Sequence, residues 1–141
     1  MSYNLFLDDI RDPWMVGDYI YPFEIKALYR KERWNVVRNY SEFCAFIESN
    51  GLPEIISFDH DLADEHYTPQ EYWESYEKSK NYQAGKQYKE KTGLDCAKWF
   101  IDYIIDGGHE LPKMLCHSLN PVGKDNILAL FESYKKSKEN I

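Results

Sequence analysis

Ionisable residues gather in three short segments of this chain, and each segment directly follows a short apolar run. The segments contain Asp8, Asp9 and Arg11, then Asp59, His60 and Asp61, and lastly His117, Ser118 and Asn120. Carboxylates suit hard divalent cations, imidazole exchanges protons near neutral pH, and the guanidinium group of arginine binds phosphate oxygens. The three segments therefore carry the side chains of a metal-binding or phosphate-binding site, if the fold brings them together.

The apolar runs before these segments predict strands, and stretches with helical spacing alternate with them. Strands are expected over residues 3–7, 34–37, 55–58 and 114–116. Helices are expected over 23–30, from an N-cap at Ser41 to Gly51, over 94–105, and after residues 120–123 through 131. Residues 10–22, with two prolines and a glycine, are expected to form a loop, and the polar tail 135–141 is expected to fray.

This alternation predicts a single α/β domain over residues 1–141, a flavodoxin-like three-layer sandwich with helices on both faces of a short parallel sheet. Right-handed crossovers favour the strand order 2-1-3-4 and a ligand site outside the carboxyl ends of the strands. Residues 64–92 hold five tyrosines and almost no aliphatic residues, which indicates a partly helical insertion after the third strand. Its aromatic side chains would either cover the site and stack a base, or pack as a surface hairpin.

In that order, the three strands that end in ionisable residues are neighbours, spaced about 4.8 Å apart. The carboxylates of Asp8, Asp9, Asp59 and Asp61 would repel one another unless protons or a cation neutralised them. We therefore expect a divalent cation, Mg²⁺ or Mn²⁺. Zn²⁺ is an alternative because the site would include histidine. Each segment alone could consist of turn and capping residues. His66 and His109 lie in polar surroundings that indicate no role.

Composition limits the class of partner. The formal net charge of −7 argues against binding to extended nucleic acid, although a local site can still bind a small phosphate-containing ligand. No run approaches the roughly 20 apolar residues of a membrane span, and no signal peptide is expected. The three cysteines lie in apolar segments without metal-binding spacing, so buried free thiols in a cytoplasmic protein are expected.

Two segments resemble parts of response-regulator receiver domains. Residues 5–9 are similar to their first strand and acidic pair, and residues 55–59 to their third strand, which would place Asp59 at the phosphoacceptor position. Receivers carry a lysine after a fifth strand, whereas this chain is expected to end after a fourth strand and one helix. His117 and Ser118 stand where receivers have a hydroxyl residue.

A more specific resemblance is to the cyclic-phosphate-processing receiver-like domains. It rests on the segments LDDIRDP (7–13), SFDHDL (57–62), GLD (93–95) and HSLNPVGKDN (117–126), which span nearly the whole chain outside the insertion. This resemblance implies binding or hydrolysis of cyclic or terminal phosphates of a nucleotide or RNA.

The leading hypothesis is a small phosphoesterase in which His60 and His117 share the work of general base and general acid. Asp59 and the other acidic residues would bind a metal or orient the histidines, and the residue types do not choose between a metal route and a metal-free route. The expected phosphate-binding side chains are Arg11, Ser118, Asn120 and Lys124. Two alternatives remain open: a signalling receiver phosphorylated on Asp59, and a non-catalytic module that binds a nucleotide or a protein.

Overall fold

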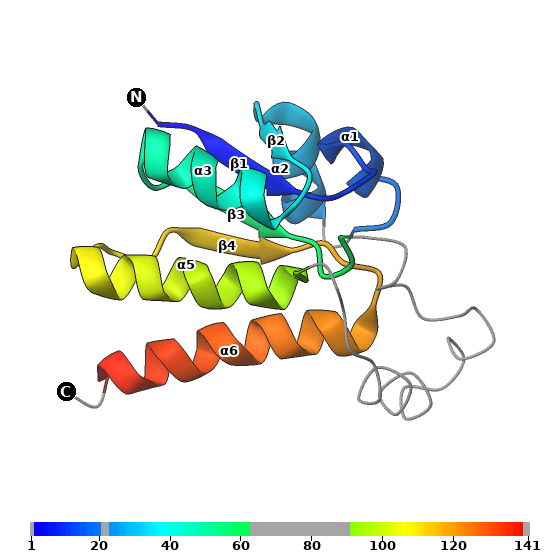
Figure 1. Cartoon of the computed structure of the whole chain (residues 1–141). Coiled ribbons are helices and arrows are strands. Elements are labelled where there is room, and N and C mark those ends of the chain that lie inside the picture. Colours follow the sequence, from blue (N-terminus) through cyan, green and yellow to red (C-terminus); the bar gives the residue numbers. More distant parts are fainter. Residues whose placement is uncertain (1, 21–22, 63–90, 140–141) are drawn as a thin grey trace.

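The computed structural model describes residues 2–20, 23–62 and 91–139. Within these ranges the chain forms one parallel sheet with helices on both faces (Figure 1). The predicted insertion 64–92 lies outside the described residues, except for Lys91 and Thr92. No helix in the described ranges is both long and apolar enough to cross a membrane.

The sheet has the predicted order. Its strands are β1 (Asn4–Leu7), β2 (Asn35–Val37), β3 (Ile55–Phe58) and β4 (Lys113–Cys116). All pairs are parallel in the order β2-β1-β3-β4, which confirms the receiver-like, flavodoxin-like topology. The register is flush, because Leu7 pairs with Phe58 and Phe58 pairs with Cys116. The residues that follow these three strands therefore form one row across the edge of the sheet.

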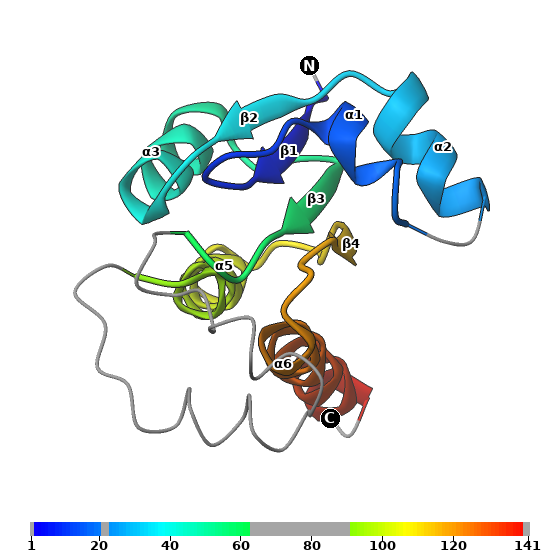
Figure 2. The ribbon, with the colours of Figure 1, turned by 90° about the vertical axis from the view of Figure 1, so that its right-hand side faces the viewer.

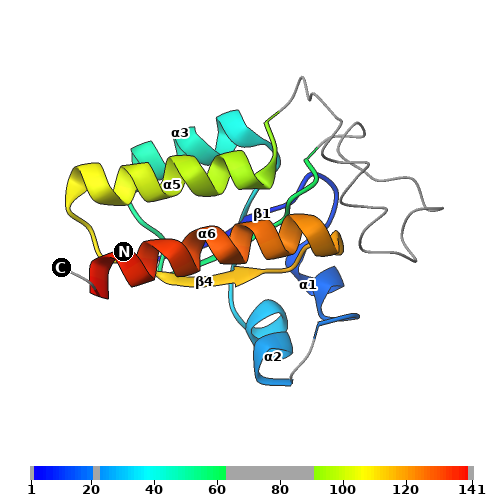
Figure 3. The same cartoon turned by 90° about the horizontal axis from the view of Figure 1, so that it is seen from below.

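Side-chain alternation divides the core between the two faces. Leu5, Leu7, Ile56 and Phe58 belong to the larger core cluster, which is covered by α3 (Tyr40–Asn50), α5 (Gly93–Gly107) and α6 (Pro121–Glu139). Phe6, from the other face of β1, packs in a smaller cluster under α1 (Pro13–Val16) and α2 (Phe23–Lys31). Figures 2 and 3 show α1 and α2 on the side of the sheet opposite to α3 and α5.

One additional short helix and two helix ends are the main differences from the sequence-based expectation. Helix α3 is capped by Asn39 and not Ser41, since the Asn39 side chain accepts a hydrogen bond from the backbone N–H of Glu42. The expected loop 10–22 contains the single turn α1, which Pro13 begins in its favoured first position. The expected frayed tail continues α6 as far as Glu139, with lysines in the last turn that suit the negative end of the helix dipole. The cysteines are buried and free, as predicted.

Candidate functional site

Asp8, Asp59 and His117 form the row that follows β1, β3 and β4. Each backbone N–H continues the sheet by donating across it, to the carbonyls of Val37, Leu7 and Phe58 at 3.0–3.1 Å. Because side chains alternate along a strand, all three point to the face covered by α1 and α2. One ligand atom of each lies within 4.8 Å of the others, and all three side chains are buried. The site lies at the end of the sheet where α1 and the first turns of α5 and α6 gather (Figure 1).

Asp8 is held by hydrogen bonds to both carboxylate oxygens. Oδ1 accepts from the backbone N–H groups of Ile10 and Arg11 at 2.9 and 2.8 Å. Oδ2 lies 3.0 Å from Nε2 of His117 and 3.4 Å from Nη1 of Arg11. Burial acts to raise the pKa of Asp8, but the hydrogen bonds from His117 and the backbone outweigh it and lower this pKa. Asp8 is therefore ionised at neutral pH.

Asp59 has the opposite environment. Its Oδ1 accepts from the backbone N–H of His60, whereas Oδ2 is buried without a hydrogen-bond partner in the described part of the chain. Burial, followed by the charges of Asp8 and Asp61, raises the pKa of Asp59 to about 8, and Arg11 at 3.9 Å only partly opposes this. The Oδ2 atom is thus the point of the site that gains most from a proton or a cation.

His117 is enclosed on all sides. Its ring stacks on Phe6 with centroids 4.3 Å apart, and Nδ1 lies 2.6 Å from Oγ of Ser57 while Nε2 faces Asp8. The side chain is fully buried, which lowers the pKa of His117, and the hydrogen bond to Asp8 opposes this only in part. Both ring nitrogens are therefore engaged inside the protein, and the ring is neutral at pH 7.

His60 belongs to a second group of polar side chains, next to the first. It follows Asp59 directly, so its side chain projects from the opposite face of the sheet. Nδ1 of His60 lies 2.9 Å from Oδ1 of Asp61, and Nδ2 of Asn120 donates to the same oxygen at 3.1 Å. Oδ1 of Asn120 accepts from the backbone N–H of Gly123 at 3.0 Å, so Asn120 also caps α6. Nε2 of His60 makes no hydrogen bond to any residue that the structure describes.

Gly93 and Gly123 lie in the GLD and HSLNPVGKDN segments, and both are in close contact with residues that follow β3. A Cβ at Gly123 would lie 2.3 Å from Cγ of His60, and a Cβ at Gly93 would lie 1.7 Å from the carbonyl oxygen of Asp59. The backbone N–H of Gly93 donates to the carbonyl of His60 at 2.8 Å. Helices α5 and α6 therefore begin in direct contact with the strand-end residues, and only glycine fits at the two contact points.

The remaining predicted site residues lie around these two groups. Asp9 is half-buried, and its charge contributes to the raised pKa of Asp59. Lys124, half-buried in the first turn of α6, contributes to the lowered pKa of His117. Ser118 accepts from the backbone N–H of Asn120 at 3.1 Å. His109 is exposed and stacks on Tyr103 near the end of α5, while His66 lies outside the described residues.

Three further residues, Arg38, Ser57 and Tyr29, contact the site although their sequence positions did not predict it. Nη1 of Arg38 donates to the carbonyls of Asp8 and Arg11 at 3.2 and 2.7 Å, and this holds the loop that follows β1. The sequence feature that could have identified Arg38 is its position directly after β2, at the same edge of the sheet. Ser57 is a hydroxyl residue within an otherwise apolar buried strand, and that contrast was its signal.

One protein family matches most of the chain. The cyclic-phosphate processing receiver domain matches residues 3–133. The chain belongs to this family. No curated protein and no solved structure matches the chain. The match covers the three strand ends and both glycine contacts of this receiver domain, so the two polar groups lie wholly within the shared region.

Proposed function

We propose that this receiver domain is a phosphoesterase for a cyclic or terminal phosphate of a nucleotide or RNA, with His60 as its general base. The arrangement of His60, Asp61 and Asn120 supports this proposal most directly. When Nδ1–H of His60 donates to Asp61, Nε2 keeps its lone pair and can accept a proton. Asn120 in turn orients Asp61, so the base is held by a third group, as in other enzymes that activate a hydroxyl.

In the proposed reaction, Nε2 of His60 takes the proton of a water molecule while the water oxygen forms a bond to phosphorus. The bond from phosphorus to the leaving oxygen breaks, and the proton on His60 then passes to that oxygen. Asp61 stabilises the positive charge of the ring between these two transfers. The Arg11 guanidinium and the Lys124 ammonium supply positive charge for the phosphate oxygens.

His117 receives a different role from the one that the sequence suggested. A proton donor to a leaving group needs a ring nitrogen that faces the ligand, whereas both nitrogens of His117 are engaged and its side chain is 0% exposed. We therefore assign His117 to the placement of Asp8. The strand-end carboxylates would then act through charge and His60 through proton transfer.

A divalent cation fits the carboxylates of this site. The buried Oδ2 of Asp59 without a partner and the raised pKa of that group indicate a place where a cation is stabilised. Asp8, Asp9 and Asp59 would hold the ion, and Asp61 already accepts from His60 and Asn120. When bound, Mg²⁺ or Mn²⁺ would supply charge that neutralises the phosphate and lowers the pKa of water.

Hydrolysis by the full chain tests the proposal. The substrates are 2′,3′- and 3′,5′-cyclic nucleotides and RNA with a terminal cyclic phosphate, each with Mg²⁺, with Mn²⁺ and with a chelator. His60→Ala should reduce the rate about 10²–10⁴-fold with folding intact, because a general base contributes that much. His109→Ala, a matched change at an exposed histidine, should not alter the rate. Absence of turnover by the wild type in every condition would favour a non-catalytic nucleotide-binding module, and acetyl-phosphate labelling of Asp59 would favour the signalling receiver.

A further inference from the structure

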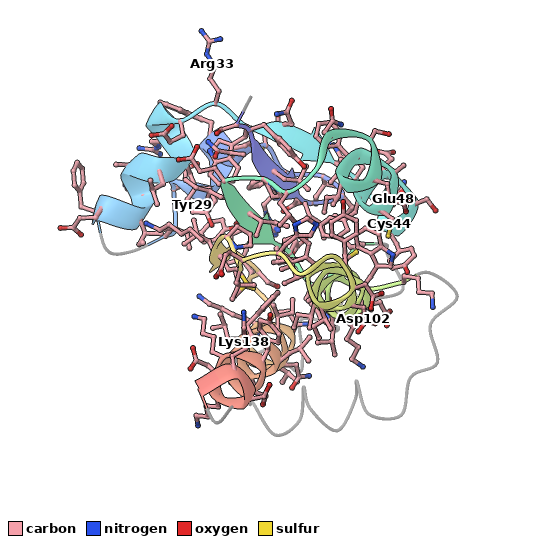
Figure 4. All side chains as sticks on the ribbon, turned by 90° about the vertical axis from the view of Figure 1, so that its left-hand side faces the viewer. Tyr29, Arg33, Cys44, Glu48, Asp102 and Lys138 are labelled. Carbon is pink, nitrogen blue, oxygen red and sulfur yellow. The ribbon has the colours of Figure 1, made fainter. Side chains whose placement is uncertain are left out.

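A series of hydrogen bonds leads from α2 along one face of the sheet to Asp8. The hydroxyl of Tyr29 lies 2.5 Å from Oγ of Ser57, which lies 2.6 Å from Nδ1 of His117, and Nε2 of His117 lies 3.0 Å from Oδ2 of Asp8. The exposed fractions of Tyr29, Ser57 and His117 are 2%, 0% and 0%. Tyr29 belongs to α2, which lies on one side of the sheet (Figure 4). The strand-end side chains point to the same side.

The chemistry of the four groups permits only one order of donors and acceptors along these hydrogen bonds. An ionised Asp8 only accepts, so Nε2 of His117 must carry the proton. Complete burial opposes a charged ring, so Nδ1 is a bare acceptor and the Ser57 hydroxyl must donate to it. The Ser57 oxygen then accepts from the hydroxyl of Tyr29. With donors and acceptors in this order, the Tyr29 and Ser57 hydroxyls and both ring nitrogens of His117 all have a partner.

We propose that Tyr29 and Ser57 are positioning residues of the site: their hydroxyls hold His117 as a neutral Nε2–H donor, which fixes the carboxylate of Asp8 beside Arg11 and Asp59. Both hydroxyls act through His117 and not through a contact of their own with a ligand. The proposal extends the proposed function, because it gives α2 the task of supporting the strand-end carboxylates.

The His117 ring is tightly packed, so its position depends on the hydrogen bond from the Ser57 hydroxyl. Phe6 stacks on one face of the ring, and the ring of Tyr29 meets it edge-on with centroids 6.0 Å apart. Loss of the Ser57 hydroxyl would leave Nδ1 buried without a partner, and the ring could restore a hydrogen bond only by moving away from Asp8. Removal of such an outer partner typically weakens metal binding by about 10–100-fold.

Tyr19 supplies a matched control for Tyr29. Its hydroxyl donates to the backbone carbonyl of His117 at 2.8 Å, so Tyr19→Phe removes a hydrogen bond at the same residue without touching the ring. Tyr29→Phe removes the first hydroxyl of the series, and Ser57→Ala removes the donor to Nδ1. All three substitutions delete a single hydroxyl oxygen.

Two measurements on the full chain test the proposal. In ¹⁵N NMR at pH 7, wild-type His117 should be the neutral Nε2–H form with a hydrogen-bonded Nδ1. The Nδ1 signal should move to the position of an unbonded nitrogen in Ser57→Ala, move less in Tyr29→Phe and stay in Tyr19→Phe. In calorimetry, Ser57→Ala should bind Mn²⁺ about 10–100-fold more weakly, while Tyr19→Phe stays within about twofold of the wild type.

The outcomes separate this proposal from the proposed function, because neither measurement requires turnover. A charged ring or an Nδ1–H form in the wild type overturns the proposal, as does an unchanged Nδ1 signal in Ser57→Ala. Equal Mn²⁺ affinity of Ser57→Ala and the wild type overturns it as well. If the wild type binds no Mn²⁺, the metal part of the proposed function fails, and the NMR signals alone decide whether the hydroxyls hold His117.

Discussion

Replacement of Asp59 by asparagine should stabilise the protein in the absence of a divalent cation. The side chain is 1% exposed, its Oδ2 has no partner in the described part of the chain, and its pKa is raised to about 8 from 3.8. Asparagine has nearly the same shape, keeps an acceptor for the backbone N–H of His60 and cannot ionise. The substitution therefore removes the cost of a buried charge with little change in packing.

The expected gain follows from proton linkage. Between pH 3.8 and 8 the unfolded chain has released the Asp59 proton while the folded chain retains it, so folding becomes less favourable as pH rises. One pKa unit corresponds to about 1.4 kcal/mol, which gives Asp59→Asn an advantage of about 2 kcal/mol at pH 5 and about 4 kcal/mol at pH 7. The advantage should vanish near pH 4 and stop growing above pH 8.

Urea unfolding in a chelating buffer at pH 4, 5, 6, 7 and 8 measures this difference. Asp102→Asn, at an exposed position of α5, is the matched control and should leave the free energy of unfolding unchanged within about 0.5 kcal/mol. A stability difference between Asp59→Asn and the wild type that is independent of pH would refute the reasoning, since it would mean that Asp59 is ionised in the folded protein.

Three further outcomes can be measured. Mn²⁺ at 100 times its dissociation constant should stabilise the wild type by about 2.7 kcal/mol in thermal unfolding and Asp59→Asn by much less; equal shifts would contradict the proposed ligand. Gly123→Ala should displace His60 and reduce hydrolysis with a stability loss of about 1–3 kcal/mol, and full activity would show that the close contact is unimportant. Asn120→Ala and Asn39→Ala each remove a helix N-cap and should each cost about 1 kcal/mol in urea unfolding, but only Asn120→Ala should reduce turnover.

The strand order and the strand ends could be predicted from the sequence because both depend on local patterns. Apolar runs, each followed at once by charged residues, locate the edge of the sheet, and right-handed crossovers limit the topology. The same reasoning correctly brought Asp8 and Asp59 into one site. It also left Ser118 and Asn120 as alternative caps of the last helix, and the structure shows that Asn120 is the cap.

The faces of the sheet to which His60 and His117 point could not be predicted from the fact that both residues follow strands. His60 follows its strand at the second position and His117 at the first, so the two rings project to opposite faces of the sheet. The role of Tyr29 was beyond local patterns, because its hydroxyl meets Ser57 across 28 residues of sequence. Only the packing of α2 against the sheet shows that the two residues are partners.

The hydrogen bond between His60 and Gly93 has a consequence for how this domain can diversify. It joins residues 60 and 93, so the sequence between β3 and α5 begins and ends at two points that are held together. The entropic cost of closing a loop changes by only about 0.6 kcal/mol for each doubling of its length. Segments of very different length and composition can therefore be exchanged at this point while the strand ends and their carboxylates stay in place. The strand-end residues thus form a fixed frame, and the length of the sequence between residues 60 and 93 can change without altering it.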